Sequence, residues 1–233
     1  MKIKGLQKTT LIDYPGKIAC SLFLFGCNFR CGFCHNPELV LEDSGPNINE
    51  EEFFDFLNKR KEYLDGICIS GGEPLLSLDL DFLRRIKEMG YSIKLDTNGS
   101  FPEKLKELIK ENLVDFVAMD IKGSKDKYSK IAGVQVDIKK IEESIKLISG
   151  LGDYEFRTTI LRDIHNKEEL IKMGEWVIKI VGKKPKKHVL QGFKNRGKVL
   201  SKVFETEKDT SEKELLDAKE IVKDYFENVE VRE

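Results

Sequence analysis

The sequence contains no long apolar run and almost no excess of charge. No stretch of about 18 apolar residues occurs in its 233 residues, and the start MKIKGLQKTT lacks the apolar core of a signal peptide. Forty Lys and Arg against 41 Asp and Glu leave a net charge of -1, so no overall field draws the chain to nucleic acid or to an anionic membrane. We therefore expect a cytoplasmic protein that binds no nucleic acid and no membrane.

Linkers are absent as well. The sequence has only six Pro, and it has no repeat, low-complexity tract or segment rich in Pro, Gly and Ser, so no boundary between domains is visible. With 40% hydrophobic residues, the chain is long enough to bury one large core. We predict a single domain over residues 1–233.

Short apolar runs alternate with helical patterns, as is typical of βα units that form a parallel sheet. The apolar runs predict six strands, over 17–24, 66–70, 91–95, 115–120, 155–160 and 187–191. Apolar residues three and four apart predict helices over 50–63, 78–89, 102–112, 137–149 and 166–181. A helix over 211–226 and a strand over 229–231 follow. A doubly wound sheet and a (β/α) barrel both fit, and in both the loops after the strands form the site.

Cysteine is scarce, but three of the five cysteines lie within eight positions, in the segment FGCNFRCGFCHN. Three thiolates on one short loop can hold an iron–sulfur cube and leave one iron without a protein ligand. A zinc site with His35 or another group as fourth ligand is the alternative, but structural zinc sites usually pair two separated ligand groups, and no second pair occurs. Cys20 and Cys68 fall in apolar strands, where we predict that they pack in the core.

The cysteine segment resembles the signature of a known superfamily. Cys27, Cys31 and Cys34 form a CxxxCxxC motif with Phe33 before the last cysteine, and this motif resembles the radical S-adenosylmethionine superfamily. Within that superfamily, GLQKTTLIDYPGK and FGCNFRCGFCHNPEL resemble glycyl-radical-enzyme activases, in particular the activating proteins of anaerobic ribonucleotide reductase.

This resemblance implies an α/β fold, a partial (β/α)6 radical-SAM barrel. Its core would cover about 16–192, followed by a C-terminal helix and short strand over about 209–232. The resemblance also implies a [4Fe-4S] cluster on the three cysteines, with S-adenosyl-L-methionine at the fourth iron and Phe33 beside it. One-electron cleavage of this cofactor would give a 5′-deoxyadenosyl radical that acts on a large glycyl radical enzyme, with flavodoxin or ferredoxin as reductant.

Paired glycines follow the second predicted strand, in Gly71-Gly72-Glu73-Pro74. Glycine lets the backbone approach a ligand that a side chain would exclude, although a tight turn before a helix explains the pair as well. By the resemblance, this GGEP motif meets the amino group of the cofactor's methionine part, so Gly71, Gly72 and Glu73 are predicted to bind the cofactor.

Two strand ends carry oxygen ligands. Asp96, Thr97 and Asn98 follow the strand over 91–95, and Asp120 ends the next one. The Asn-Gly pair fits a simple turn, whereas the carboxylates suit a small cation or the cofactor's hydroxyls. By the resemblance, Asp96, Thr97 and Asn98 bind the cofactor, and Asp96 and Asp120 contribute to a monovalent-cation site near it.

Lys122 and Arg157 are predicted to oppose the cofactor's carboxylate, because Lys122 resembles an activase lysine and Arg157 lies in an otherwise apolar strand, where a charge needs a partner. His188 and Gln191 are three residues apart on the last barrel strand, so at most one of them faces inward, and we predict that it is Gln191. His165, near a helix start, is predicted to be a surface or capping residue.

Two other functions fit part of the sequence. A radical enzyme that acts on a small molecule, such as a deazapurine or a peptide precursor, would share the cysteine loop and the GGEP motif. An iron–sulfur electron-transfer or metal-sensing module would share only the cysteine loop. The absence of a further cysteine group for an auxiliary cluster favours a compact activase.

Overall fold

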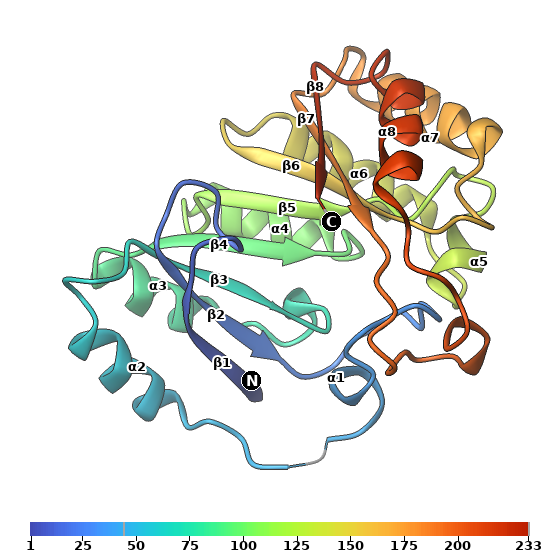
Figure 1. The fold of residues 1–233 in the computed structure, drawn as a ribbon. Helices are drawn as coiled ribbons and strands as arrows, with labels where there is room; N and C mark the ends of the chain where they lie inside the picture. Colours follow the sequence, from blue (N-terminus) through green and yellow to red (C-terminus); the bar gives the residue numbers. More distant parts are fainter. Residues whose placement is uncertain (44, 233) are drawn as a thin grey trace. The chain divides into compact units, whose positions relative to one another are not determined.

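The computed structural model describes residues 1–43 and 45–232, which form two compact units (Figure 1). The first unit contains residues 1–28, 38–97 and 103–117, and the second contains residues 29–37, 98–102 and those from 118 onward. In both units strands and helices alternate along the chain, as predicted. No helix in the described ranges is long and apolar enough to cross a membrane.

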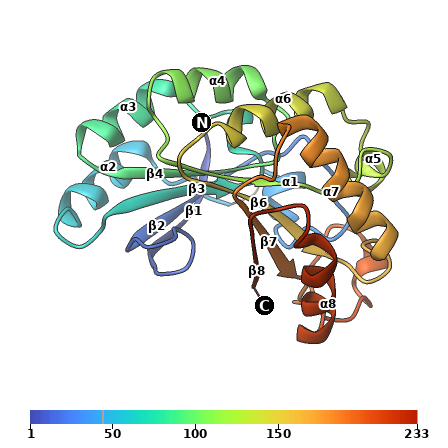
Figure 2. The same cartoon turned by 90° about the horizontal axis from the view of Figure 1, so that it is seen from above.

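The first unit is built on four strands that neighbour one another in sequence order. β1 (Ile3–Thr10) runs antiparallel to β2 (Ala19–Leu24), while β2, β3 (Gly66–Gly71) and β4 (Ser92–Thr97) run parallel. The register pairs Cys68 of β3 with Ser21 of β2 and with Lys94 of β4. The helices of this unit are α1 (Glu38–Leu41), α2 (Glu50–Lys59), η1 (Pro74–Leu76), α3 (Leu80–Glu88) and α4 (Pro102–Lys110). Figure 2 shows α2 and α3 on the same side of these strands.

Helix α2 illustrates how the sequence builds this layer. Asn49 caps the helix by accepting a hydrogen bond from the Glu51 N–H at 2.8 Å. Phe53 is fully buried, and its ring centre lies 5.7 Å from that of Phe82 in α3. Burying a side chain of this size stabilises the fold by about 1.5–3 kcal/mol. The helix ends at Lys59, earlier than predicted, because the next N–H, of Arg60, bonds the Leu57 carbonyl in a turn.

The second unit continues the same pattern. β5 (Phe116–Asp120) leads into it, and β6 (Tyr154–Ile160), β7 (Lys187–Gly192) and β8 (Asn228–Arg232) run parallel. The helices are α5 (Tyr128–Ala132), α6 (Ile138–Ser149), α7 (Lys167–Val181), η2 (Lys202–Phe204) and α8 (Glu212–Val222). The Arg232 guanidinium donates to both carboxylate oxygens of buried Glu155, at 2.9 and 2.8 Å, which fixes β8 at the edge of β7.

All six predicted barrel strands are confirmed, as are the C-terminal helix and strand. Strand β1 was missed. Its sequence IKGLQKTT has no alternation of apolar and polar residues, and only Ile3 and Thr10 are buried at its two ends. The strand owes its place to antiparallel pairing with β2 rather than to a buried face of its own. Tertiary pairing therefore overrides a weak local signal here.

Candidate cofactor site

The predicted site residues divide between the two units. The first unit holds Cys27, Gly71, Gly72, Glu73, Asp96 and Thr97. The second holds Cys31, Phe33, Cys34, Asn98, Asp120, Lys122, Arg157 and Gln191. Apart from Arg157, which lies within β6 (Tyr154–Ile160), these residues lie at or beyond the carboxyl ends of strands, where α/β folds place their sites.

The cysteine loop begins three residues after β2, and none of the five cysteines, all within the described ranges, forms a disulfide. The Cys34 N–H donates to the Cys31 carbonyl at 3.0 Å, which folds the CGFC segment into a turn. Burial raises the pKa of the Cys31 thiol, although the nearby Lys122 ammonium acts in the opposite direction. Because metal binding requires the thiolate, loading this cysteine releases a proton.

Three thiols on one loop fit a [4Fe-4S] cluster, because each thiolate of a cubane binds its own iron. Within residues 1–43 and 45–232, no three His, Cys, Asp or Glu side chains are grouped as the ligands of one metal ion. His35, the proposed fourth zinc ligand, is instead stacked on Phe193 with ring centres 5.2 Å apart. Three thiols thus supply a donor set that fits the cluster.

Phe33 is packed inside the second unit. Its ring meets the edge of Phe204 with ring centres 5.9 Å apart, and the Lys122 ammonium lies 5.8 Å from the Phe33 ring centre. These contacts connect the cysteine loop to the charged end of β5.

The paired glycines of the GGEP motif allow two backbone segments to approach closely. Gly71 has φ +119°, and a Cβ there would lie 2.4 Å from the Leu24 backbone. A Cβ on Gly72 would lie 2.1 Å from the Gly26 carbonyl oxygen, while the Glu73 N–H donates to that same carbonyl at 2.7 Å. The glycines thus pack the motif against the chain that leads into the cysteine loop.

Glu73 is fully buried and its carboxylate is used inside the protein. It accepts a hydrogen bond from the Leu75 N–H at 3.1 Å, which caps η1, and another from the Thr97 hydroxyl at 2.8 Å. The structure therefore brings together two predicted residues, Glu73 and Thr97, that are far apart in the sequence.

We predict that Gly72→Ala destabilises the protein by about 1–3 kcal/mol, because the added methyl group has no space beside Gly26. Denaturant unfolding measures the change. Gly152→Ala is the matched control, since nothing lies within 4 Å of a Cβ at that position. Equal stability of the two variants would show that the close approach is not needed.

The end of β4 carries a buried ion pair that the sequence analysis did not identify. Lys94 is 2% exposed and its ammonium group pairs with the Asp96 carboxylate, whose other oxygen accepts from the Ser70 hydroxyl at 3.0 Å. The ammonium also lies 3.7 Å from the Cys68 sulfur. A lone lysine in the apolar run SIKL was the available signal, since a buried charge needs a partner.

The end of β5 carries a second charged cluster, in which Asp120 pairs with Lys122 at 2.9 Å and with Arg157 at 3.0 Å. Lys122 and Arg157 are only 14% and 13% exposed. Burial raises the pKa of Asp120, but the two cations outweigh it and hold this pKa well below its usual value. Asp120 therefore binds two cations at once. The partner that we expected for Arg157 is therefore Asp120.

Asn98 forms the simple turn that the sequence left open. Its side-chain oxygen accepts from the Ser100 N–H at 2.9 Å, and Gly99 has φ +78°. A Cβ on Gly99 would lie 2.1 Å from the Met119 methyl carbon, so this turn requires glycine.

The histidines have structural roles. His188 is fully buried, shares a 2.9 Å hydrogen bond with Thr158, and burial lowers its pKa to about 3, so it is neutral. Gln191 is half-buried near the end of β7, and that it faces the cofactor stays a prediction.

The prediction that His165 lies at the surface or caps a helix was wrong. It is buried, accepts from the Leu161 N–H at 3.0 Å, and forms a hydrogen bond with the Lys122 carbonyl at 3.0 Å. It therefore anchors the chain that carries Lys122.

Cys20 and Cys68 are core residues, as predicted. Both are buried, and burial raises the pKa of the Cys20 thiol to about 12. An uncharged, enclosed thiol of this kind is unreactive.

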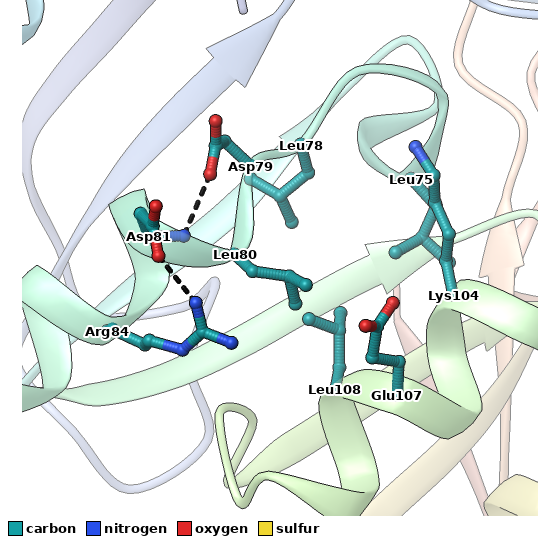
Figure 3. Close-up of a pocket in the computed structure, with 9 residues that line it drawn as sticks. All are labelled: Leu75, Leu78, Asp79, Leu80, Asp81, Arg84, Lys104, Glu107 and Leu108. Atoms are coloured by element: carbon teal, nitrogen blue, oxygen red, sulfur yellow. Dashed lines mark hydrogen bonds and ion pairs between the residues drawn. The ribbon is translucent and has the colours of Figure 1, made fainter.

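The first unit also contains a pocket of about 350 Å³ between α3 and α4 (Figure 3). Leu75, Leu78, Leu80 and Leu108 form its apolar lining. Among its charged residues, Arg84 pairs with Asp81, and Asp79 caps α3. None of the predicted site residues lines this pocket.

Comparison with known proteins places the chain in a family. The model of the radical SAM superfamily matches residues 21–177, more than half of the chain. A Methanocaldococcus jannaschii protein whose name assigns it to the glycyl-radical enzyme activating enzymes is 35% identical over 239 residues, which cover 99% of this chain and 95% of that protein. The pyruvate formate-lyase-activating enzyme of Clostridium pasteurianum is 35% identical over 127 residues, 52% of each chain.

Solved structures show the fold. A domain of a pyruvate-formate lyase-activating enzyme from Bacteroides vulgatus has a TM-score of 0.57 at 17% identity, over 72% of this chain and 99% of that one. A structure of TYW1 with a lysine-pyruvate adduct has a TM-score of 0.62 at 14% identity, over 89% and 74%. The predicted α/β radical-SAM fold is thus confirmed, and the family implies a [4Fe-4S] cluster and S-adenosylmethionine as cofactors. The chain belongs to the radical SAM superfamily and, within it, to the glycyl-radical-enzyme activating enzymes.

Proposed function

We propose that the chain generates a glycyl radical on an anaerobic ribonucleotide reductase. The observation that carries activation of a glycyl radical enzyme is the match over 99% of the chain to a protein named for that activity. The choice of ribonucleotide reductase is supported by the segments GLQKTTLIDYPGK and FGCNFRCGFCHNPEL, which resemble the activating proteins of that enzyme.

When bound, the cluster and S-adenosylmethionine supply a one-electron reductive cleavage that yields methionine and a 5′-deoxyadenosyl radical. We assign Cys27, Cys31 and Cys34 to three irons of the cluster. We assign Lys122 and Arg157 to the carboxylate of the methionine part, because both are cationic side chains at one site and a carboxylate can accept from both.

The remaining cofactor contacts in the proposal come from both units: Phe33, Gly71, Gly72, Glu73, Asp96, Thr97, Asn98 and Gln191. A monovalent cation at Asp96 and Asp120 also belongs to the proposal. Each carboxylate already has a cationic side chain beside it, namely Lys94 for Asp96 and the pair described above for Asp120. A bound cation would therefore share each carboxylate with a cationic side chain.

We further propose that both units act as one radical-SAM domain, because the family model runs without interruption through segments of both. The electron would come from flavodoxin or ferredoxin in the reducing cytoplasm, where thiols remain available for a cluster. A glycine α-hydrogen suits this chemistry because the flanking amides stabilise the radical left behind, so no deprotonating base is needed.

Electron paramagnetic resonance tests the proposal. Reduced protein, S-adenosylmethionine and the host's anaerobic ribonucleotide reductase are mixed without oxygen, and a doublet glycyl signal is expected. The signal should disappear when the C-terminal radical-site glycine of the reductase is replaced by alanine. If no glycyl radical enzyme of the host responds while a small metabolite stimulates 5′-deoxyadenosine formation and accepts the radical, the proposal is wrong and the small-molecule function holds.

A further inference from the structure

One face of the strands in the first unit carries a row of polar side chains. The register sets Ser21 of β2, Cys68 of β3 and Lys94 of β4 beside one another. Side chains two residues apart along a strand point to the same face, so Asp96 shares the face of Lys94. Ser70 likewise shares the face of Cys68. The three strands lie side by side in Figure 1, and the row runs along them to Asp96, a predicted cofactor residue.

Lys94 is closed to solvent within this row. Its side chain is 2% exposed, and its ammonium group forms an ion pair with the carboxylate of Asp96, whose side chain is 16% exposed. The ammonium group also lies 3.7 Å from the Cys68 sulfur and 5.9 Å from the centre of the Phe116 ring. Solvent therefore reaches the Asp96 side chain but hardly reaches Lys94. A ligand that binds Asp96 from outside is affected by Lys94 only through this carboxylate.

The ion pair is a poor means of stabilising the fold. Taking two charges out of water costs about as much free energy as their attraction returns, and apolar residues of similar volume often replace such a pair without loss of stability. A methionine at position 94 would fill similar space between the Cys68 sulfur and the Phe116 ring. Stability therefore does not explain why a charged side chain stands at this position.

The contacts of Asp96 fix its carboxylate at both oxygens. One oxygen pairs with the Lys94 ammonium group, and the other accepts a hydrogen bond from the Ser70 hydroxyl at 3.0 Å. The two donors come from neighbouring strands, so they hold the carboxylate in one orientation. A ligand that binds a side chain already held in place avoids the entropy cost of ordering it.

We propose that Lys94 is a positioning residue, which together with Ser70 holds the Asp96 carboxylate in the orientation that binds S-adenosylmethionine. This inference rests on the proposed function, which assigns Asp96 to the cofactor. Lys94 itself makes no contact with the cofactor in this proposal. Its effect is to keep the carboxylate ordered before the cofactor arrives, so its removal weakens binding and leaves the chemistry of the bound cofactor unchanged.

The test measures the affinity of cluster-loaded protein for S-adenosylmethionine by equilibrium dialysis. Lys94→Met removes the ammonium group and keeps an unbranched side chain of similar volume, and Ser70→Ala removes the other donor. Both changes are also made in an Asp96→Asn background. The Michaelis constant and turnover number for dithionite-driven 5′-deoxyadenosine formation, the iron content and urea unfolding are recorded for each variant.

Lys4→Met is the matched control. The Lys4 side chain is 7% exposed, its ammonium group pairs with the Asp43 carboxylate at 2.6 Å, and it lies 5.8 Å from the centre of the Phe25 ring. Lys4 thus resembles Lys94 in burial, in charge pairing and in its ring contact, and it belongs to the same unit. Its partner Asp43 is not a predicted cofactor residue.

We expect Lys94→Met to weaken cofactor binding about tenfold and Ser70→Ala about threefold, because each change frees one oxygen of the carboxylate. The Michaelis constant should rise by the same factors, while the turnover number at saturating cofactor stays within about twofold of the wild type. Neither change should weaken binding further in the Asp96→Asn background, because both act through that carboxylate. Lys4→Met should bind the cofactor as the wild type does.

Three results would overturn the inference: unchanged affinity in both Lys94→Met and Ser70→Ala, an equal loss in Lys4→Met, or a loss that adds to that of Asp96→Asn. If Lys94→Met does not fold, Ser70→Ala decides by the same criteria. A wild type that binds no S-adenosylmethionine would reject the proposed function and the inference with it. Binding by the wild type with both variants unaffected would reject the inference alone.

Discussion

Replacing any one of Cys27, Cys31 and Cys34 with alanine is expected to remove the cluster. Anaerobically reconstituted wild-type protein should carry about four iron and four sulfide per chain, and each variant should carry close to none, because the three thiolates hold one cubane. Iron and sulfide analysis together with the visible absorption of the cluster measures the loss.

Cys20→Ala and Cys68→Ala are the controls for this result. Both thiols are buried in strands of the first unit, so their removal costs packing but no ligand. Loss of iron in either control would mean that the ligands are misassigned. Stable zinc binding without iron uptake in the wild type would contradict the cluster itself.

Asp120→Asn is expected to reduce the free energy of unfolding by about 2–4 kcal/mol, since it leaves Lys122 and Arg157 together without their shared carboxylate. Asp126→Asn, at an exposed position in the same connection, should change stability by less than about 0.5 kcal/mol. Urea unfolding at neutral pH provides both values.

At low pH, the difference in unfolding free energy between the wild type and Asp120→Asn should disappear. The pKa of Asp120 lies below its usual value in the folded protein, so the charged carboxylate stabilises the fold fully above the unfolded pKa of about 4. As the pH falls from there through the folded pKa, that contribution is lost. A wild-type advantage that persists undiminished under strongly acidic conditions would show that it does not come from the charge of Asp120.

The fold was predictable because its signals are local. Six apolar runs and the helical spacing between them identify the alternation of a parallel sheet, and caps such as Asn49 and Ser211 confirm where helices begin. Strand β1 was missed because it has few buried residues and depends on pairing with β2. The helices α1 and α5 were missed because four and five residues are too short to show a helical spacing of apolar residues.

The residue types of the site could be predicted from the sequence, but the side chains that these residues contact could not. Spacing identified the cysteine loop, and a charge in an apolar strand identified Arg157. Sequence spacing does not show that Arg157 shares Asp120 with Lys122, or that Glu73 meets Thr97, because these pairs form only when separate strand ends come together. Lys94 carried the same signal as Arg157, a charge in an apolar strand, and was overlooked.

The glycine pair shows that one motif can serve two structural roles. Gly71 and Gly72 were predicted to make space for a ligand, and in the structure their missing side chains also make space for the backbone of Leu24 and Gly26. Both roles demand glycine, so the motif alone cannot separate them.

The products formed from S-adenosylmethionine test the central claim most directly. Cluster-loaded, dithionite-reduced protein is incubated with the cofactor in the absence of oxygen, and the products are separated by chromatography. The account predicts methionine and 5′-deoxyadenosine in equal amounts, with neither formed by the Cys31→Ala variant. Products of methyl transfer, or an unchanged cofactor in the presence of a fully loaded and reduced cluster, would contradict it.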